Sequence, residues 1–283
     1  MLPWLFVATL GTGGGVPEQG KMTGQTEHLR VVFEAPSAWT IDEIWYDGFK
    51  VAGPTGHYGT VLIPAGGEWI GTGHSEGGRE IVRELELIAD GEPRPVQVGG
   101  TVEAEELTLT KRSTIHRFDA THTITLLGDE IVERAQLRAT EDHELQLMYL
   151  FMHCIEPATP RWLAETPDGE IVEGTFEADK DMELARDARW AAEWFPEQQL
   201  SVLLYLTRVP EPADSAILLW DQPHYHKFYV KHNSGLSLSE GEELDFTLVL
   251  KVVSGETGDW AATKAAADEL KRRYPPVDND GRI

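Results

Sequence analysis

The stretch THTITLLGDEIVERAQLRA, residues 121–139, decides the fold class. Two runs rich in Thr, Ile, Leu and Val flank the dipeptide Gly128-Asp129. Strand-forming runs on both sides of such a dipeptide are typical of two antiparallel strands joined by a tight turn. We therefore expect a hairpin whose strands cover residues 121–127 and 130–139.

The same pattern recurs along most of the chain. Runs rich in β-branched and aromatic residues are separated by clusters of Gly, Pro and Asp, as in all-β sandwiches and unlike βαβ units. Further strands are expected at residues 30–35, 60–63, 80–89, 106–110, 144–153, 200–207, 216–220, 224–231 and 243–253. The sequence thus predicts an all-β fold, a large antiparallel β-sandwich of two sheets.

Helical character is confined to a segment near the C-terminus. Asp259 is expected to cap a helix that runs to Tyr274, because alanine-rich turns follow it and basic residues gather before Pro275. A second, shorter helical pattern covers residues 179–186.

The chain has the length and composition of one domain. With 283 residues and 41% hydrophobic side chains it can bury one large core. We divide it into a flexible or leader segment (1–24), a single β-sandwich domain (25–274) and a frayed tail (275–283).

The N-terminal segment does not fix the cellular compartment of the protein. Residues 2–10 are apolar, but no Lys or Arg precedes them, so they are a signal remnant, a leader or a first strand. The segment is too short to span a bilayer. We favour a secreted or periplasmic protein over a cytoplasmic one.

Charge and motifs exclude several classes of function. The 48 acidic against 24 basic residues give a net charge of -24, which repels phosphate backbones, so nucleic acid is not an expected partner. Cys154 is the single cysteine of the sequence, which excludes an intrachain disulfide. Walker and HExxH motifs are absent from the sequence, as is a GxGxxG that follows a strand. Residues 73–77, GHSEG, have the GxSxG spacing, but a strand is expected after them instead of the helix of a nucleophile elbow. Nucleotide-binding, α/β-hydrolase and zincin classes therefore lack their full signatures.

The first polar cluster is GTGHSEGGRE, residues 71–80. Its glycines allow tight turns that bring the imidazole of His74 and the carboxylate of Glu76 close to a ligand. The alternative is a connecting loop with solvated side chains.

The second polar cluster is WDQPHYHKFYVKH, residues 220–232. Strand alternation gives one face with His224, His226, Phe228 and Val230, and another with Tyr225, Lys227, Tyr229 and Lys231. His224 and His226 could share a divalent metal, although we expect no cofactor. A Tyr-Lys face is typical of a solvated strand, so we expect the His face to line the pocket, with His226 essential and Tyr225 dispensable.

A third set is aromatic and consists of Trp162, Trp190, Trp194 and Trp220, with Arg189 beside Trp190. Indoles stack on sugar faces and Arg holds carboxylates, although each Trp could equally fill the core. Of the remaining histidines, His116 and His153 are candidates.

Five segments resemble the galactose-mutarotase-like supersandwich proteins over residues 30–253. They are STIH (113–116), LAETPDG (163–169), DARWA (187–191), WDQPHYHK (220–227) and LSLSEGE (236–242). The resemblance implies a function directed at carbohydrates, because that group includes sugar epimerases, polysaccharide lyases and noncatalytic sugar binders. The epimerase motifs Asn-His-x-x-Phe-Asn and His-Pro are absent from the sequence, which disfavours an aldose mutarotase and favours a lyase-like or uncharacterised member of the group.

Two hypotheses remain. The first is a lyase or epimerase of acidic saccharides, with His74, His116, His226 and Tyr225 in acid-base roles and Glu76, Arg189, Trp190, Asp221, His224 and Lys227 in substrate binding. It predicts that His74 and His226 face one cleft. The second is a noncatalytic module that binds a saccharide or a partner protein. The sugar, the linkage and the oligomeric state stay open.

Overall fold

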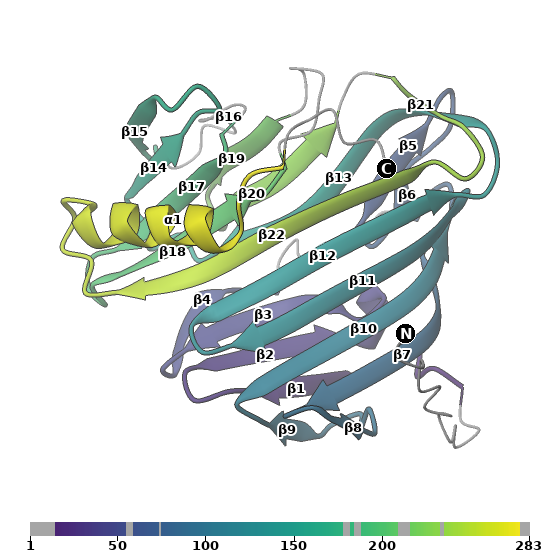
Figure 1. Ribbon diagram of the computed structural model, residues 1–283, viewed down its shortest axis with the longest axis horizontal. Coiled ribbons are helices and arrows are strands. Elements are labelled where there is room, and N and C mark those ends of the chain that lie inside the picture. Colours follow the sequence, from purple (N-terminus) through teal and green to yellow (C-terminus); the bar gives the residue numbers. More distant parts are fainter. Residues whose placement is uncertain are drawn as a thin grey trace, which may run out of the picture.

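The computed structural model describes residues 15–54, 59–73, 75–177, 182–183, 188–208, 216–232 and 235–277. These residues form two large sheets, mostly antiparallel, which lie one behind the other in Figure 1. The predicted all-β sandwich is confirmed.

Sheet A has 12 strands, and its main path is ordered β16-β19-β20-β13-β4-β3-β2-β1-β9. Its strands are β1 (Lys21–Gln25), β2 (Leu29–Glu34), β3 (Thr40–Tyr46), β4 (Phe49–Ala52), β5 (Val61–Pro64), β6 (Ile70–Gly71), β9 (Thr101–Glu103), β13 (His143–Ile155), β16 (Met182–Glu183), β19 (Ala216–Gln222), β20 (Tyr225–His232) and β21 (Leu236–Leu238).

Sheet B has 10 strands in the order β15-β14-β17-β18-β22-β12-β11-β10-β7-β8. They are β7 (Ile81–Ala89), β8 (Glu92–Arg94), β10 (Glu106–Ile115), β11 (Phe118–Leu127), β12 (Glu130–Ala139), β14 (Arg161–Glu165), β15 (Ile171–Thr175), β17 (Trp190–Phe195), β18 (Leu200–Leu206) and β22 (Glu243–Ser254). A 3-10 helix covers Ala35–Ser37 and helix α1 covers Ala261–Arg273.

The hairpin that decided the fold class lies inside sheet B. Leu127 pairs with Glu130, so Gly128 and Asp129 form the expected two-residue turn. Ile124, Leu126, Ile131, Ala135 and Leu137 point into the core between the sheets. This period of two is what an amphipathic strand requires when one face meets the partner sheet.

Helix α1 lies along β18 and β22, on the face of sheet B turned away from sheet A (Figure 1). It buries Leu270 and covers a second apolar cluster that includes Trp190, Tyr205 and Trp260. This helix therefore gives sheet B an apolar layer on both faces.

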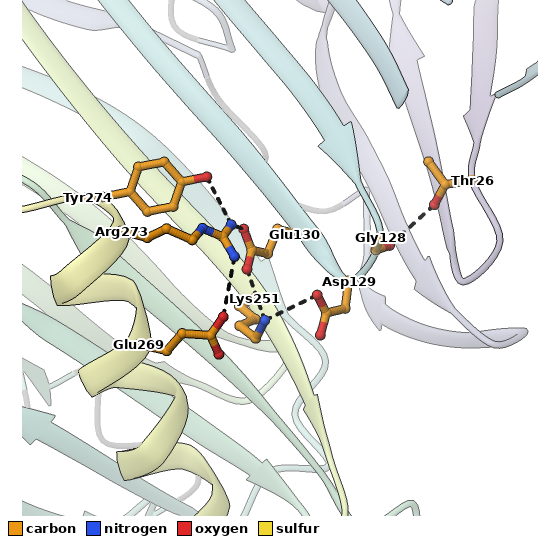
Figure 2. Close-up of polar contacts among 8 residues, drawn as sticks. All are labelled: Thr26, Gly128, Asp129, Glu130, Lys251, Glu269, Arg273 and Tyr274. Atoms are coloured by element: carbon orange, nitrogen blue, oxygen red, sulfur yellow. Dashed lines mark hydrogen bonds and ion pairs between the residues drawn. The ribbon is translucent and has the colours of Figure 1, made fainter. Parts of the chain in front are cut away.

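Charged groups fasten the end of α1 to the β11–β12 turn (Figure 2). Arg273 pairs with Glu130 and, at 3.4 Å, with Glu269. Lys251 bridges Glu130 at 2.9 Å and Asp129 at 3.2 Å. Thr26, in the turn between β1 and β2 of sheet A, donates to the carbonyl of Gly128 at 3.4 Å, so the β11–β12 turn also contacts the other half of the sandwich.

The ends of several elements differ from the sequence-based expectations. Residues 21–24, placed in the leader segment, belong to β1, and Val277 of the expected tail donates to the carbonyl of Thr207. The helical pattern at 179–186 is wrong for Met182–Glu183, which form β16, and its other residues lie outside the described ranges. Within the described residues, no helix is long and apolar enough to cross a bilayer.

The start of α1 also differs from the expectation. Trp260, with φ of 64°, occupies the N-cap position, and among the helix amides Asp259 accepts from that of Ala261. Buried Glu256 does most of the capping, since its carboxylate accepts from the amides of Gly258, Trp260 and Thr263 and from the Thr263 hydroxyl. The capping group thus lies three residues before the position that the sequence pattern predicts.

We predict that Glu256→Ala lowers the free energy of unfolding by about 2–4 kcal/mol, because it leaves buried amide donors without their carboxylate. Urea denaturation measures the loss. Glu256→Gln keeps one acceptor oxygen and should lose less, and Glu197→Ala, in the exposed β17–β18 turn, should change little. Equal stability of the Glu256 and Glu197 variants would contradict the capping role.

Candidate functional site

Four aromatic side chains form a row on the face of sheet A that is turned away from sheet B. Ring centroids are 5.7 Å apart between Trp69 and Tyr149, 5.2 Å between Tyr149 and Tyr229, and 6.0 Å between Tyr229 and Trp220. Tyr229 is buried, and the other three are half-buried. We call these four residues the aromatic row.

Strand alternation produces this row. Tyr229 of β20 and Trp220 of β19 face outward, while their sequence neighbours Phe228 and Leu219 belong to the core between the sheets. Tyr149 comes from β13, whose pairing with β20 and β5 brings the rings together. Strand alternation and pairing thus bring Trp220, Tyr229 and Tyr149 together, and Trp69 joins them from the loop just before β6.

Lys227 lies on the same face as the row. Its Nζ is 5.6 Å from the centroid of the Tyr229 ring, and the residue is 9% exposed. Burial lowers the pKa of its ammonium group below the ordinary value. The expectation that the Tyr-Lys face is solvated is wrong for Lys227 and Tyr229, which are buried, whereas Tyr225 and Lys231 are half-buried.

The His face of β20 points into the sandwich. His226 is 4% exposed and stacks on Phe176 with ring centroids 3.5 Å apart. Its Nδ1 is 2.6 Å from the Thr159 hydroxyl and 3.6 Å from Glu193. Its Nε2 is 3.7 Å from Asp221, so the structure brings together two residues that the sequence had selected, His226 and Asp221.

This His226 cluster has the electrostatics of a buried site. Glu193 and Asp221 are both fully buried. Burial raises the pKa of the Glu193 carboxyl, although hydrogen bonds and the charge of His226 oppose the rise. Thr159 donates to Glu193 at 2.8 Å, and the amide of Glu177 donates to Asp221 at 2.7 Å. The cluster can hold a proton, but its side chains are buried, so a saccharide from solution does not reach them.

A pocket lies between the sheets beside β13. Its empty volume is about 460 Å³ including its open mouth. Among its lining residues, His153 Nε2 and Glu133 are 2.6 Å apart, and His122 Nε2 is 2.9 Å from the Thr60 hydroxyl. His153, a candidate from the sequence, thus meets a carboxylate that the sequence pattern did not indicate.

The backbone of β13 is irregular at this pocket. Phe151 has φ of 50°, and the pairing of β13 with β20 shifts register between Leu150 and His153. A bulky residue in the left-handed region costs on the order of 1–3 kcal/mol. Four successive residues of this irregular stretch, 150–153, line the pocket, and Met152 also packs in the apolar cluster that includes Tyr229.

The glycine-rich loop is anchored by a buried ion pair next to that pocket. Glu80 is 2.9 Å from Lys111 and accepts from Ser113 at 2.6 Å. Gly71, with φ of 137°, lies so close to strand β5 that an added Cβ would be 2.2 Å from the carbonyl of Thr60. Glu76 is exposed in this loop, and His74 and its expected shared cleft with His226 lie outside the described residues.

Three other candidate site residues lie on elements other than β20. His116 is exposed in the β10–β11 turn and contacts the ring of His143. Trp190 is 1% exposed beneath α1 and donates to Glu165, so it has no free ring face for a sugar. Arg189, half-buried, precedes it at the start of β17 in sheet B.

His224 is exposed in the β19–β20 turn, whereas His226 is buried, so the two do not share a strand face. In the described ranges, no group of three or more His, Cys, Asp or Glu is arranged to hold a metal ion. The sequence analysis did not select Trp69, Tyr149 or Glu193 as site residues. Tyr149, which packs against Tyr229, could have been selected, because it lies in the strand expected at residues 144–153.

No protein-family model and no curated protein matches the sequence. Similar solved structures include a putative aldose 1-epimerase from Escherichia coli K12, with TM-score 0.43 and 10% identity over 82% of this chain and 98% of that one. A galactose mutarotase-like protein from Lactobacillus casei ATCC 334 gives TM-score 0.47 and 11% identity over 82% of this chain and 100% of that one.

Heparan sulfate lyase HepC from Pedobacter heparinus gives TM-score 0.45 and 7% identity over 81% of this chain and 33% of that one. These include the kinds of protein that the sequence segments resemble. The likenesses lie in the arrangement of strands and assign no activity to this chain.

We predict that His122 makes stability depend on pH. Burial, and next the charge of Lys111, lower its pKa from 6.5 to about 4 against the opposing charge of Glu80. Between these values the unfolded chain binds a proton that the folded protein does not, so stability falls as pH falls from 6.5 to about 4. The expected loss is roughly 3 kcal/mol.

Urea denaturation across this pH range measures the loss. His122→Gln should remove this part of the slope. The matched variant is His28→Gln, at a half-buried surface histidine whose pKa the hydrogen bond with Asp47 raises, and it should not flatten the slope. An unchanged slope in His122→Gln would contradict the assignment.

Proposed function

We propose that the protein is a carbohydrate-active enzyme that binds an acidic saccharide on the aromatic row and removes a proton next to the sugar carboxylate. The observation that carries the proposal is the row itself, with three half-buried rings and two lysines of β20 on one face of sheet A. The proposed chemistry is that of a lyase or an epimerase, since both begin with this proton transfer.

The rings suit a saccharide. Sugar rings present flat faces of C-H groups, and these stack on the faces of indole and phenol rings. Trp69, Tyr149 and Trp220 are partly exposed around buried Tyr229, so they offer ring surface for more than one sugar residue. A saccharide would lie across β13, β20 and β19.

The charge on this face favours an acidic ligand. In a chain with net charge -24, an anion needs a local cation in order to bind. Lys231 pairs with Tyr149 in the register of β20 and β13, so it stands beside the row and can hold a uronate carboxylate.

Tyr225 is the proposed base. It begins β20 and shares the outer face with Lys227 by strand alternation. The His face, which the sequence favoured, is enclosed by Glu193, Thr159 and Phe176. We therefore move the proposed proton transfer to the Tyr-Lys face and assign the His226 cluster to holding β20 in place.

The noncatalytic alternative rests on the same row, because stacked rings alone suffice for a binding module. A panel of acidic polysaccharides distinguishes the two. A lyase yields an unsaturated uronate that absorbs ultraviolet light, and an epimerase exchanges the sugar proton in D₂O. Binding without either signal would establish the module instead.

We predict that Trp220→Ala weakens binding of an acidic oligosaccharide about tenfold, because one stacking surface is lost. Isothermal titration calorimetry measures the affinity. The matched control is Trp45→Ala, a half-buried indole of β3 under the guanidinium of Arg30, which should bind normally. Equal affinities of the two variants would remove the row from the site.

We predict that Tyr225→Phe lowers turnover by a factor of about 100 or more while affinity stays within about twofold, because only the proton acceptor is lost. Initial rates and calorimetry on the same preparation measure both. Unchanged turnover at unchanged thermal stability would exclude Tyr225 as the base.

A further inference from the structure

We propose that His116 and His143 together bind a divalent transition metal ion such as zinc, where the β10–β11 turn meets the start of β13. Neither residue belongs to the aromatic row, so the site goes beyond the proposed function and does not rest on it. The ligand class follows from the donor atoms, because zinc, copper and nickel ions prefer imidazole nitrogen, whereas magnesium and calcium ions prefer oxygen.

His143 supplies a ring nitrogen with a lone pair. Its Nδ1 is 2.9 Å from the backbone carbonyl of Glu141, and a carbonyl only accepts, so Nδ1 carries the hydrogen and Nε2 of the neutral ring does not. His143 is 8% exposed, and among the described residues its buried Nε2 has no hydrogen-bond partner. A histidine whose other ring nitrogen donates to a carbonyl is oriented as metal-ligating histidines are.

His116 lies at the distance that a shared ion requires. The two ring centroids are 5.6 Å apart, and the ring planes are inclined by 78°. A zinc–nitrogen bond of about 2 Å, added to the roughly 1 Å from nitrogen to ring centroid, separates the centroids of two imidazoles on one tetrahedral ion by about 5 Å. His116 is exposed, so a rotation of its ring both opens the way to Nε2 of His143 and brings its own nitrogen to the ion.

Arg117 holds the two histidine-bearing segments side by side. Its Nη1 donates to the carbonyl of Asp142 at 3.0 Å, and its Nε is 3.2 Å from the carboxylate of Glu141. Its own carbonyl accepts from the amide of Thr140 at 2.9 Å. The two imidazoles therefore stay close without a metal ion, which lowers the entropic cost of binding one.

The backbone at His116 is a further indication. His116 is the first of the two residues that connect Ile115 to Phe118, and its φ is 50°. Two-residue hairpin turns favour Gly and Asn at positions of positive φ, so a histidine there is consistent with a use for its side chain. The net charge of -24 favours the approach of a cation.

Water completes the coordination of the ion, since two histidines fill only two of four positions. We therefore expect an affinity below that of structural zinc sites with four protein ligands. The ion would fasten the β10–β11 turn to β13 and stabilise the folded chain by mass action.

The experiment uses the full chain without an affinity tag, freed of metal ions by EDTA and dialysis, and titrated with zinc chloride in a calorimeter. We expect His116→Asn to weaken zinc binding at least tenfold, and Asn tolerates the positive φ of this turn. The matched control is His28→Asn, at another surface histidine, which should bind zinc within about twofold of the wild type. Magnesium chloride should bind the wild type at least tenfold more weakly than zinc chloride.

A second measurement counts the nitrogen ligands. The electron paramagnetic resonance spectrum of bound copper(II) should show two imidazole nitrogens in the wild type and fewer in His116→Asn. Equal zinc affinities of the wild type and His116→Asn, or the same number of copper-bound nitrogens in both, would overturn the site. Because His116 is exposed, neither result depends on replacing the buried His143, and neither bears on saccharide binding at the aromatic row.

Discussion

The register of β20 between β13 and β19 is the constraint on which the rest of the site depends. It places Lys227 opposite Cys154 on one side and Trp220 on the other. Because strand side chains alternate with a period of two, a slip by one residue would exchange the two faces of β20. His226 would then leave Glu193, and lysine side chains of the outer face would turn into the core, where desolvation of an ammonium group is costly.

The polar groups between the sheets support this register. His226 with Glu193, His153 with Glu133 and Lys111 with Glu80 each join strands of different sheets or distant segments. Burying such groups costs desolvation free energy, and their hydrogen bonds and ion pairs compensate for it only in the correct geometry. They therefore destabilise misaligned packing more than they stabilise the native packing. This division keeps the outer face of sheet A, where rings remain partly exposed, available for the proposed saccharide binding.

The sequence predicted the fold better than the site. The β11–β12 hairpin and the C-terminal helix follow from local patterns, but the cap at Glu256 does not, because its partners are fixed by how the chain turns after β22. Alternation correctly separated His226 from Lys227. It could not say what covers each face, so the buried Tyr-Lys face was missed. Glu193 lies 33 residues before His226, and only the packing of the two sheets brings them together.

A crystal structure of the chain soaked with an acidic oligosaccharide tests the central claim most directly. We expect a sugar ring stacked on Trp220 or Tyr149, with its carboxylate toward Lys231. A saccharide bound instead in the pocket between the sheets, beside His153 and Glu133, or on a surface away from the aromatic row, would contradict it.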